Sequence, residues 1–430
     1  MNVKKIKETA KYMLRSYPVI KRYVNEVEGM YAMTPEELNS RNEKRFVELF
    51  RKAWNESPFY HKLYTEAGIG IDDVKCLADI KKLPVITKAM IREHIDDMLL
   101  IPKRLTVKNH TSGTTGNPLW VYEDWPSIWR EQAYFYCYRK RCGYDYRKDV
   151  IASLRGHLDR KTDSMYVGVS KTLYLSSYNL SNQIVEKYHS LLLEYKPKAI
   201  EGYPSSLFSL AKMLEEAGYD DIRIPVAFTS SETLDVNMRR FIERILHTQI
   251  YDHYGNTERT IRLEEAIGHD GYYEDPGYSI NEYEDGYVVT TSLINMSFPM
   301  IRYKVDDSIQ LKSNVNIKNV TDATVLGISG RSADCIVGKD GTRFNGAALT
   351  YFAKAIPNIQ VVQLIQQKAG AMEVCIVPED CFSESDKLEI RNVVDNILGL
   401  DNIDYSVKII TTEELRVANN GKMSLIVSDL

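Results

Sequence analysis

Short apolar runs alternate with longer helical patterns between residues 150 and 250. Strands separated by helices in this way form a mainly parallel sheet, and the loops at the carboxyl ends of the strands build a ligand site. We expect strands at 150–154, 199–203 and 226–229, and helices at 180–195, 205–218 (with Ser205 as its cap) and 234–246. The alternation therefore predicts an α/β sheet with a site along one edge.

The residues before this region are predicted to form a helical scaffold. Within 38–54 the apolar positions recur at helical spacing and predict one buried stripe, made of Phe46, Leu49, Phe50 and Ala53. Thr87 is a suitable cap for a further helix over 88–98. No chemistry is assigned to this part of the chain.

The residues after 285 change to β patterns and then to a compact tail. Residues 286–291 and 308–311 favour a small antiparallel or barrel-like sheet. The tail is predicted to contain strands at 361–366 and 373–377 and a helix at 383–398. A domain boundary is expected at 329–334, which divides the chain into a large N-terminal domain, 1–329, and a small C-terminal domain, 330–430.

Composition excludes several classes of function. The net charge of −4 over 430 residues gives no electrostatic reason to expect nucleic acid as a partner. Six scattered cysteines without a CxxC pair argue for reduced thiols and against a structural zinc. No apolar run approaches the roughly 18 residues of a membrane span and the N-terminal residues contain no hydrophobic signal core, so a cytoplasmic protein is expected. The basic residues at 4–15 fit either a solvated helix face or membrane-surface contact.

One loop has the composition of a phosphate-binding segment. It consists of Thr111, Ser112, Gly113, Thr114, Thr115 and Gly116. Its glycines let the backbone approach a ligand closely, and its hydroxyls stand beside main-chain N–H groups. No lysine follows the second glycine, so the loop is not a Walker motif. Taken alone, it fits a phosphate cradle or an ordinary polar turn.

Further motifs follow this loop in a fixed order. They are SSETL at 230–234, YGNTE at 254–258, RYKVDD at 302–307, GRSAD at 330–334 and NGK at 420–422. Together with TSGTTG, they resemble the adenylate-forming (ANL) superfamily of acyl ligases, and in particular its phenylacetate-CoA ligase and CapK-like branch. The resemblance implies an acyl-adenylate synthetase-like fold of the α/β class. That fold has a large N-terminal domain of α/β sheets plus a small β-barrel-like sheet, and a small mobile C-terminal α+β domain.

The resemblance also implies roles for single residues around ATP. The loop at 111–116 would bind the phosphates, Tyr254 would stack on the adenine, and Thr257 would contact the α-phosphate. Glu258 would bind Mg²⁺, which takes oxygen ligands. The remaining nucleotide-binding residues would be Ser231, Glu232, Gly255, Asn256, Asp307 at the ribose with Asp306 as its rival, and Arg331.

The catalytic lysine of the resemblance is Lys422. It would enter with the small domain and bridge the substrate carboxylate and the α-phosphate, replacing repulsion between two anions by attraction. At the domain hinge this chain departs from the pattern, because Ala333 stands where relatives keep Asp or Lys. Either Asp334 shares the pivot, or the domain rotation between the two half-reactions differs from that of relatives. The residues expected at the acid substrate are His157, Tyr203, Ser205 and His253, where either histidine is alternatively a structural loop residue.

The function expected from this resemblance is ATP- and Mg²⁺-dependent activation of a small-molecule carboxylic acid. The acyl group would pass to coenzyme A or to a sugar or amine in capsular or other surface polysaccharide biosynthesis. Two alternatives stay open: a nucleotidyl transferase that adenylylates a cofactor, and a catalytically weak nucleotide-binding scaffold. A homodimer would be unsurprising for the branch.

Overall fold

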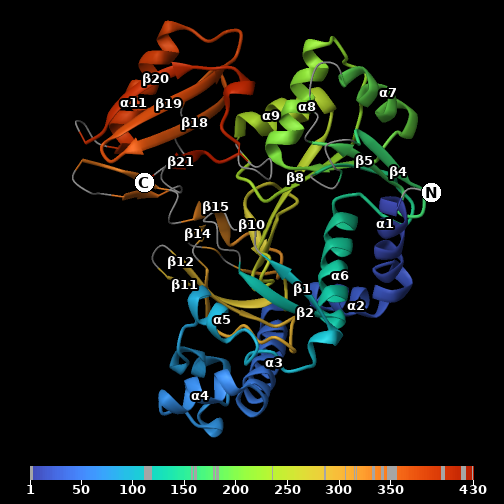
Figure 1. Ribbon diagram of the computed structural model, residues 1–430, viewed down its shortest axis with the longest axis vertical. Helices are drawn as coiled ribbons and strands as arrows, with labels where there is room; N and C mark the ends of the chain where they lie inside the picture. Colours follow the sequence, from blue (N-terminus) through green and yellow to red (C-terminus); the bar gives the residue numbers. More distant parts are fainter. Residues whose placement is uncertain are drawn as a thin grey trace.

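The computed structural model describes residues 3–110, 119–155, 158, 162–177, 180, 184–234, 236–284, 287–305, 307–313, 315, 317–331, 335–339, 343–345, 356–398, 402–417, 423–428 and 430. Its centre is a ten-stranded sheet, with N-terminal helices on one side and a second, four-stranded sheet in the C-terminal part (Figure 1). No helix in these ranges is long and apolar enough to cross a membrane.

The N-terminal scaffold is helical, as predicted. Its helices are α1 (Val3–Leu14), α2 (Tyr17–Tyr31), α3 (Pro35–Glu56), α4 (Pro58–Glu66) and α5 (Lys88–His94). The stripe predicted for 38–54 is the buried face of α3, so that prediction is confirmed. Thr87 caps α5 through the Met90 N–H, although this helix ends earlier than expected. Short 3-10 helices in this part are η1 (Ile71–Asp73), η2 (Leu77–Lys82) and η3 (Lys103–Leu105), and a further one, η4 (Thr412–Glu414), lies in the C-terminal part.

The predicted parallel strands form the middle of the large sheet. In sheet order its strands are β14 (Asp307–Leu311), β15 (Val325–Arg331), β10 (Tyr272–Glu274), β9 (Arg262–Glu265), β8 (Gln249–Gly255), β7 (Val226–Ser230), β6 (Ala199–Gly202), β3 (Ile151–Arg155), β5 (Thr172–Ser176) and β4 (Ser164–Val167). The five strands from β8 to β5 are parallel. Their carboxyl ends therefore meet along one edge.

Four helices accompany these strands. They are α6 (Trp125–Arg141), α7 (Val185–Tyr195), α8 (Pro204–Glu216) and α9 (Val236–Leu246). The prediction that Ser205 caps a helix is wrong. Pro204 occupies the first helical position of α8 and Tyr203 is the N-cap, because proline has no N–H to satisfy there. Ser205 lies within the first turn, and its hydroxyl donates to Glu232 instead.

Smaller sheets flank the large one. β1 (Thr106–His110) pairs with β2 (Trp120–Asp124), and β16 (Cys335–Val337) pairs with β17 (Arg343–Asn345). The predicted small antiparallel sheet consists of β11 (Ser279–Glu284), β12 (Tyr287–Ser292) and β13 (Tyr303–Val305). The strand predicted at 308–311 does not belong to it, because β14 pairs with β15 in the large sheet.

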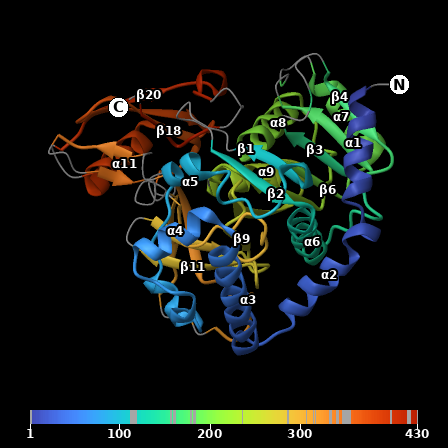
Figure 2. The ribbon, with the colours of Figure 1, turned by 60° about the horizontal axis from the view of Figure 1, so that its bottom comes forward.

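The C-terminal sheet packs on the large domain. It contains β18 (Ile359–Lys368), β19 (Ala371–Pro378), β20 (Asp404–Ile409) and β21 (Ile426–Ser428), with α11 (Glu384–Leu398). Val361 and Ile365 of β18 share one apolar cluster with α8 and α9, and Lys212 of α8 donates to Thr412. Figures 1 and 2 show this sheet as a separate layer. The large sheet extends to Arg331, and the division at 329/330 stays a prediction.

Asp252 of β8 is a buried carboxyl group inside the large sheet. Its oxygens accept hydrogen bonds from the Thr229 hydroxyl at 2.6 Å and the Tyr272 hydroxyl at 2.9 Å. Burial raises the pKa of Asp252 to about 7, and the nearby charge of Glu265 acts in the same direction. The folded chain therefore holds a proton that the unfolded chain releases near its ordinary pKa of 3.8.

Replacing this group changes how stability depends on pH. Between the two pKa values the folded state binds more protons than the unfolded state, so Asp252 lowers the free energy of unfolding as the pH rises. Asp252→Asn removes this pH-dependent contribution to the free energy of unfolding. From about pH 5 to about pH 6.5 the variant should gain about 1.4 kcal/mol per pH unit relative to the unmodified chain. Urea unfolding at both pH values measures this gain.

Asp380→Asn, which changes an exposed carboxylate, is the matched control. Parallel stability profiles for Asp252→Asn and the unmodified chain would contradict the assignment of a proton to Asp252.

Candidate active site

The carboxyl ends of β6, β7 and β8 bring two of the predicted motifs and Tyr203 together. Gly202 pairs with Thr229 and Ser230 pairs with His253 across neighbouring strands. The residues that follow these strands are Tyr203, the Ser231–Glu232 pair and the YGNTE turn. The site predicted at this edge of the sheet therefore has its described residues on adjacent loops.

The turn after β8 is fixed by its own side chains. Asn256 accepts from the Thr260 N–H at 2.9 Å and donates to the Thr260 hydroxyl at 2.7 Å. The Ser292 hydroxyl donates to the Arg259 carbonyl at 2.8 Å, which ties the turn to β12. Gly255 and Thr257 are exposed on this turn. They are available to a ligand while the backbone is held in place.

Glu258, the predicted metal ligand, is buried, and a hydrogen bond fixes the orientation of its carboxylate. Its Oε1 accepts a hydrogen bond from the Tyr303 hydroxyl at 2.8 Å. Tyr303 is itself held by main-chain bonds around Ile86: Ile86 N–H donates to Arg302 and Lys304 N–H donates to Ile86, both at 2.9 Å. Residues 83–88 thus support the carboxylate, which agrees with the predicted scaffold role.

The chemistry of Glu258 fits a magnesium ion. The Tyr303 bond occupies one carboxylate oxygen, and Mg²⁺ is commonly held by one or two carboxylates together with phosphate oxygens. Within the described ranges, no three His, Cys, Asp or Glu side chains form a metal cluster. A magnesium ion that arrives with nucleotide phosphates does not require one.

Tyr254 and Asp307, predicted to bind adenine and ribose, are in direct contact. The Tyr254 hydroxyl donates to Asp307 Oδ2 at 2.5 Å. Burial, and then the charge of Asp307, raise the pKa of Tyr254 far above its ordinary value, so the phenol stays protonated. The backbones of Asp307 and Arg331 lie opposite one another on the paired strands β14 and β15. The structure thus brings Tyr254 and Asp307 together, with the Arg331 backbone on the neighbouring strand, while Asp306 lies outside the described residues.

The Glu232 carboxylate joins the large domain to the C-terminal segment. It accepts from the Ser205 N–H and hydroxyl, each at 3.0 Å, and from the Met423 N–H at 2.9 Å. Ser231 precedes it with a φ of 73°, an αL conformation that is uncommon for serine. Met423 directly follows Lys422 in the sequence. The motif with the predicted catalytic lysine therefore adjoins a residue bonded to the nucleotide edge.

Several predicted residues lie outside the described part of the chain. They are the loop residues Thr111, Ser112, Gly113, Thr114, Thr115 and Gly116, with His157, Ala333 and Lys422. Their roles, and those of the described site residues, stay predictions.

Sequence reasoning missed a pair of charged residues beside the loop. The strands before and after it are paired up to His110 and Trp120. Asn109 donates to Glu123 Oε2 at 2.6 Å, and Arg259 forms an ion pair with Glu123 Oε1. Because Arg259 directly follows Glu258, this pair ties the base of the loop to the predicted metal ligand. The position of Arg259 after YGNTE was the only sequence signal.

His253 lies on the other face of β8 from Tyr254, because successive side chains of a strand alternate. Its ring contacts Phe135 of α6 with centroids 5.2 Å apart. Burial, followed by the charges of Arg262, Arg155 and Arg139, lowers the pKa of His253 far below 6.5. The imidazole is neutral at physiological pH.

Tyr203 lies near the arginines around His253, because the Arg155 guanidinium is 5.8 Å from the centroid of the Tyr203 ring. Two of the residues predicted at the acid substrate, Tyr203 and His253, thus lie around one arginine.

Comparison with known sequences finds relatives of two named kinds. The chain is 23% identical over 334 residues to protein CapK of Staphylococcus aureus, which covers 74% of this chain and 73% of that protein. It is 26% identical over 294 residues to phenylacetate-coenzyme A ligase of Pseudomonas putida, covering 61% and 64%. The Escherichia coli (strain K12) ligase of the same name is 25% identical over 342 residues, covering 70% and 73%. No protein-family model matches the chain.

Solved structures share the fold. 2-Hydroxyisobutyryl-CoA ligase in its postadenylation state, in complex with R3-HIB-AMP, matches with a TM-score of 0.71 and 18% identity over 93% of this chain and 91% of that one. Anthranilate CoA ligase AuaEII in complex with anthranoyl-AMP matches with a TM-score of 0.51 and 14% identity over 80% and 73%. These likenesses confirm the predicted fold class, and with the sequence relatives they confirm the resemblance.

The Glu123–Arg259 pair should contribute measurable stability. Removing one member of a buried pair costs about 3–5 kcal/mol. Arg259 keeps Glu131 as a second partner at 2.8 Å and is 20% exposed, so we expect Glu123→Gln to lower the free energy of unfolding by about 2 kcal/mol. A double-mutant cycle with Arg259→Gln, followed by urea unfolding, measures the coupling energy.

The surface pair Arg244–Glu215 is the control, with an expected coupling of about 0.5 kcal/mol or less. A Glu123–Arg259 coupling no larger than that of the surface pair would show that the two segments are not tied by charge.

Proposed function

Because the chain is an adenylate-forming, phenylacetate-coenzyme A ligase- and CapK-like protein, we propose that it is an ATP-dependent ligase that activates a carboxylic acid as acyl-AMP. The acyl group then passes to coenzyme A, or to a sugar or amine in surface polysaccharide biosynthesis. The observation that supports this most directly is the meeting of Tyr254 with Asp307 beside the buried carboxylate of Glu258.

Activation is required because a carboxylate is a poor electrophile. One carboxylate oxygen attacks the α-phosphorus of ATP, the bond to the bridging oxygen of the β-phosphate breaks, and pyrophosphate leaves. In the proposed arrangement adenine stacks on Tyr254 and the ribose hydroxyls donate to Asp307. Glu258 would hold a magnesium ion, which would neutralise charge on the phosphates.

Lys422 has the central electrostatic role in the proposal. The attacking carboxylate and the α-phosphate are both anionic, and a cation between them turns repulsion into attraction. The described residue next to it, Met423, donates its N–H to Glu232 at 2.9 Å. The protein would act in the cytoplasm, where ATP is supplied.

Acid-dependent exchange of labelled pyrophosphate into ATP tests the proposal. The reverse of adenylation makes ATP from acyl-AMP and pyrophosphate, so exchange requires both the nucleotide site and the acid. We expect exchange that depends on a member of a panel of carboxylic acids and on Mg²⁺. Exchange only with a hydroxyl- or phosphate-bearing cofactor would favour nucleotidyl transfer. No exchange with any compound, while ATP still binds, would favour a scaffold.

Lys422→Ala should separate binding from chemistry. We expect the exchange rate to fall by at least about a hundredfold, because a preorganised charge at the reacting groups is often worth a few kcal/mol. ATP affinity, measured by calorimetry, should stay within about threefold, since the lysine acts mainly on the developing contact between two anions.

Lys408→Ala, which changes an exposed lysine on strand β20 of the C-terminal sheet, is the matched control and should leave the exchange rate unchanged. An unchanged exchange rate in Lys422→Ala would refute the catalytic role of Lys422.

A further inference from the structure

Arg155 has a charge that no described acidic side chain neutralises. It ends β3, and its Nη2 donates to the Ser230 hydroxyl at 2.7 Å. Its Nε is buried and has no hydrogen-bond partner among the described residues. No Asp or Glu in the described ranges forms an ion pair with it. A buried donor without a partner is costly, which points to a group that occupies this position when the protein works.

The neighbouring arginines differ from Arg155 in this respect. Arg139 forms an ion pair with Glu201 at 2.5 Å, and Arg262 forms ion pairs with Glu264 at 2.8 Å and Asp275 at 2.5 Å. Each of these two cations next to His253 therefore has a carboxylate partner of its own. Arg155 differs because no described carboxylate pairs with it.

The position of Arg155 favours the acid substrate over the nucleotide. Its Nη2 donates to Ser230, which pairs with His253 across β7 and β8, and His253 lies on the α6 face of β8, whereas Tyr254 and Asp307 meet on the opposite face. With the nucleoside at Tyr254, as in the proposed function, the acyl group would lie on the His253 side of the strand end. The neutral imidazole of His253 has no hydrogen-bond partner among the described residues and is available to a polar group there.

Building on the proposed function, we propose that the activated acid is a dicarboxylic acid whose second carboxylate binds Arg155 and accepts a hydrogen bond from His253. A guanidinium matches a planar carboxylate through two parallel N–H donors, and Arg155 retains Nε and the remaining Nη hydrogens for this purpose. One guanidinium without a described carboxylate partner offers a site for one carboxylate. A phosphate ester, with a charge near −2, would require a second unpaired cation here.

A hydrocarbon acid fits this group poorly. It would remove water from the guanidinium without supplying an acceptor, and a buried charge without a partner is strongly unfavourable. Phe135, whose ring contacts both His253 and the Arg262 guanidinium, offers an apolar surface for the methylene groups between the two carboxylates. The selectivity should therefore come from the second acid group more than from chain length.

Pairs of acids with equal carbon number test the proposal on the full-length protein. Pyrophosphate exchange is measured with succinate against butyrate, glutarate against valerate, and adipate against hexanoate. We expect the preferred diacid to exceed its monoacid partner in kcat/KM by about tenfold to a hundredfold, the range of one charged hydrogen-bonded contact. Arg155→Met should remove this preference, mainly by lowering kcat/KM for the diacid, and leave the monoacid rate within about threefold.

Two further variants keep the result decisive. Arg155→Lys retains the charge and should restore part of the diacid preference, which a purely structural role of Arg155 would not produce. Arg244→Met, in a surface ion pair, should leave both rates unchanged. Thermal unfolding shows whether each variant folds. If Arg155→Met does not fold, the diacid preference of the unmodified protein tests the dicarboxylate assignment.

The outcomes also separate this inference from the proposed function. Exchange with monoacids at rates equal to or above those of diacids would overturn the dicarboxylate assignment and leave the ligase proposal standing. A diacid preference unchanged in folded Arg155→Met would overturn the role of Arg155. Absence of exchange with every acid would overturn the ligase proposal and this inference together.

Discussion

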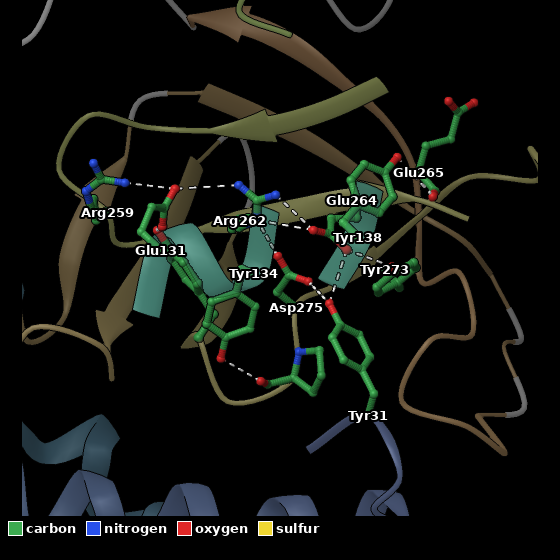
Figure 3. A network of polar contacts seen from close by, with 12 residues as sticks. Tyr31, Glu131, Tyr134, Tyr138, Arg259, Arg262, Glu264, Glu265, Tyr273 and Asp275 are labelled. Carbon is green, nitrogen blue, oxygen red and sulfur yellow. Dashed lines mark hydrogen bonds and ion pairs between the residues drawn. The ribbon is translucent and has the colours of Figure 1, made fainter. Parts of the chain in front are cut away.

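The arrangement of the large domain depends on the neutralisation of Arg262, a fully buried cation. Its guanidinium forms ion pairs with Glu264 and Asp275, and lies 3.5 Å from Glu131 of α6 (Figure 3). The Tyr31 hydroxyl of α2 donates to Asp275. Losing one partner would leave a charge buried without compensation, so α2, α6, β9 and the residues after β10 are held in one geometry.

This network of ion pairs extends to the candidate active site. Glu131 pairs with both Arg259 and Arg262, and Arg259 pairs in turn with Glu123 at the base of the predicted phosphate loop. Glu258 lies between this anchored arginine and the end of β8, and Tyr303 fixes its carboxylate from the other side. The predicted metal ligand is thereby positioned by charge pairs in the interior, while its neighbours Gly255 and Thr257 remain exposed.

The two faces of β8 divide the site into chemically different parts. Tyr254 meets an acidic group, Asp307, on one face, and His253 lies among arginines on the other. Strand alternation alone produces this separation within two consecutive residues. A ligand that joins a nucleoside to an acid by way of a phosphate would have suitable groups on both sides of the same strand end.

Local sequence patterns predicted the helices and strands, but they did not predict which distant segments of the chain pair. The stripe of α3 and the alternation from β3 to β8 follow from residue spacing, which depends on neighbours in the sequence. The membership of β14 in the large sheet and the Glu123–Arg259 pair depend on residues far apart in the chain, and no spacing encodes them. Ser205 was misread because a serine before a helix usually caps it, whereas Pro204 had already started α8. The motif resemblance supplied Tyr254, Asp307 and Glu258, and the structure added contacts that the motifs do not encode, namely Tyr303 with Glu258 and Arg155 with Ser230.

The central claim is that a nucleotide binds along the carboxyl edge of β7 and β8. A crystal structure with Mg²⁺ and a non-hydrolysable ATP analogue tests it most directly. We expect adenine on Tyr254, the ribose hydroxyls within hydrogen-bond distance of Asp307, and the metal ion on Glu258. A nucleotide bound elsewhere, with Tyr254 and Asp307 free of nucleotide and Glu258 free of metal, would contradict it.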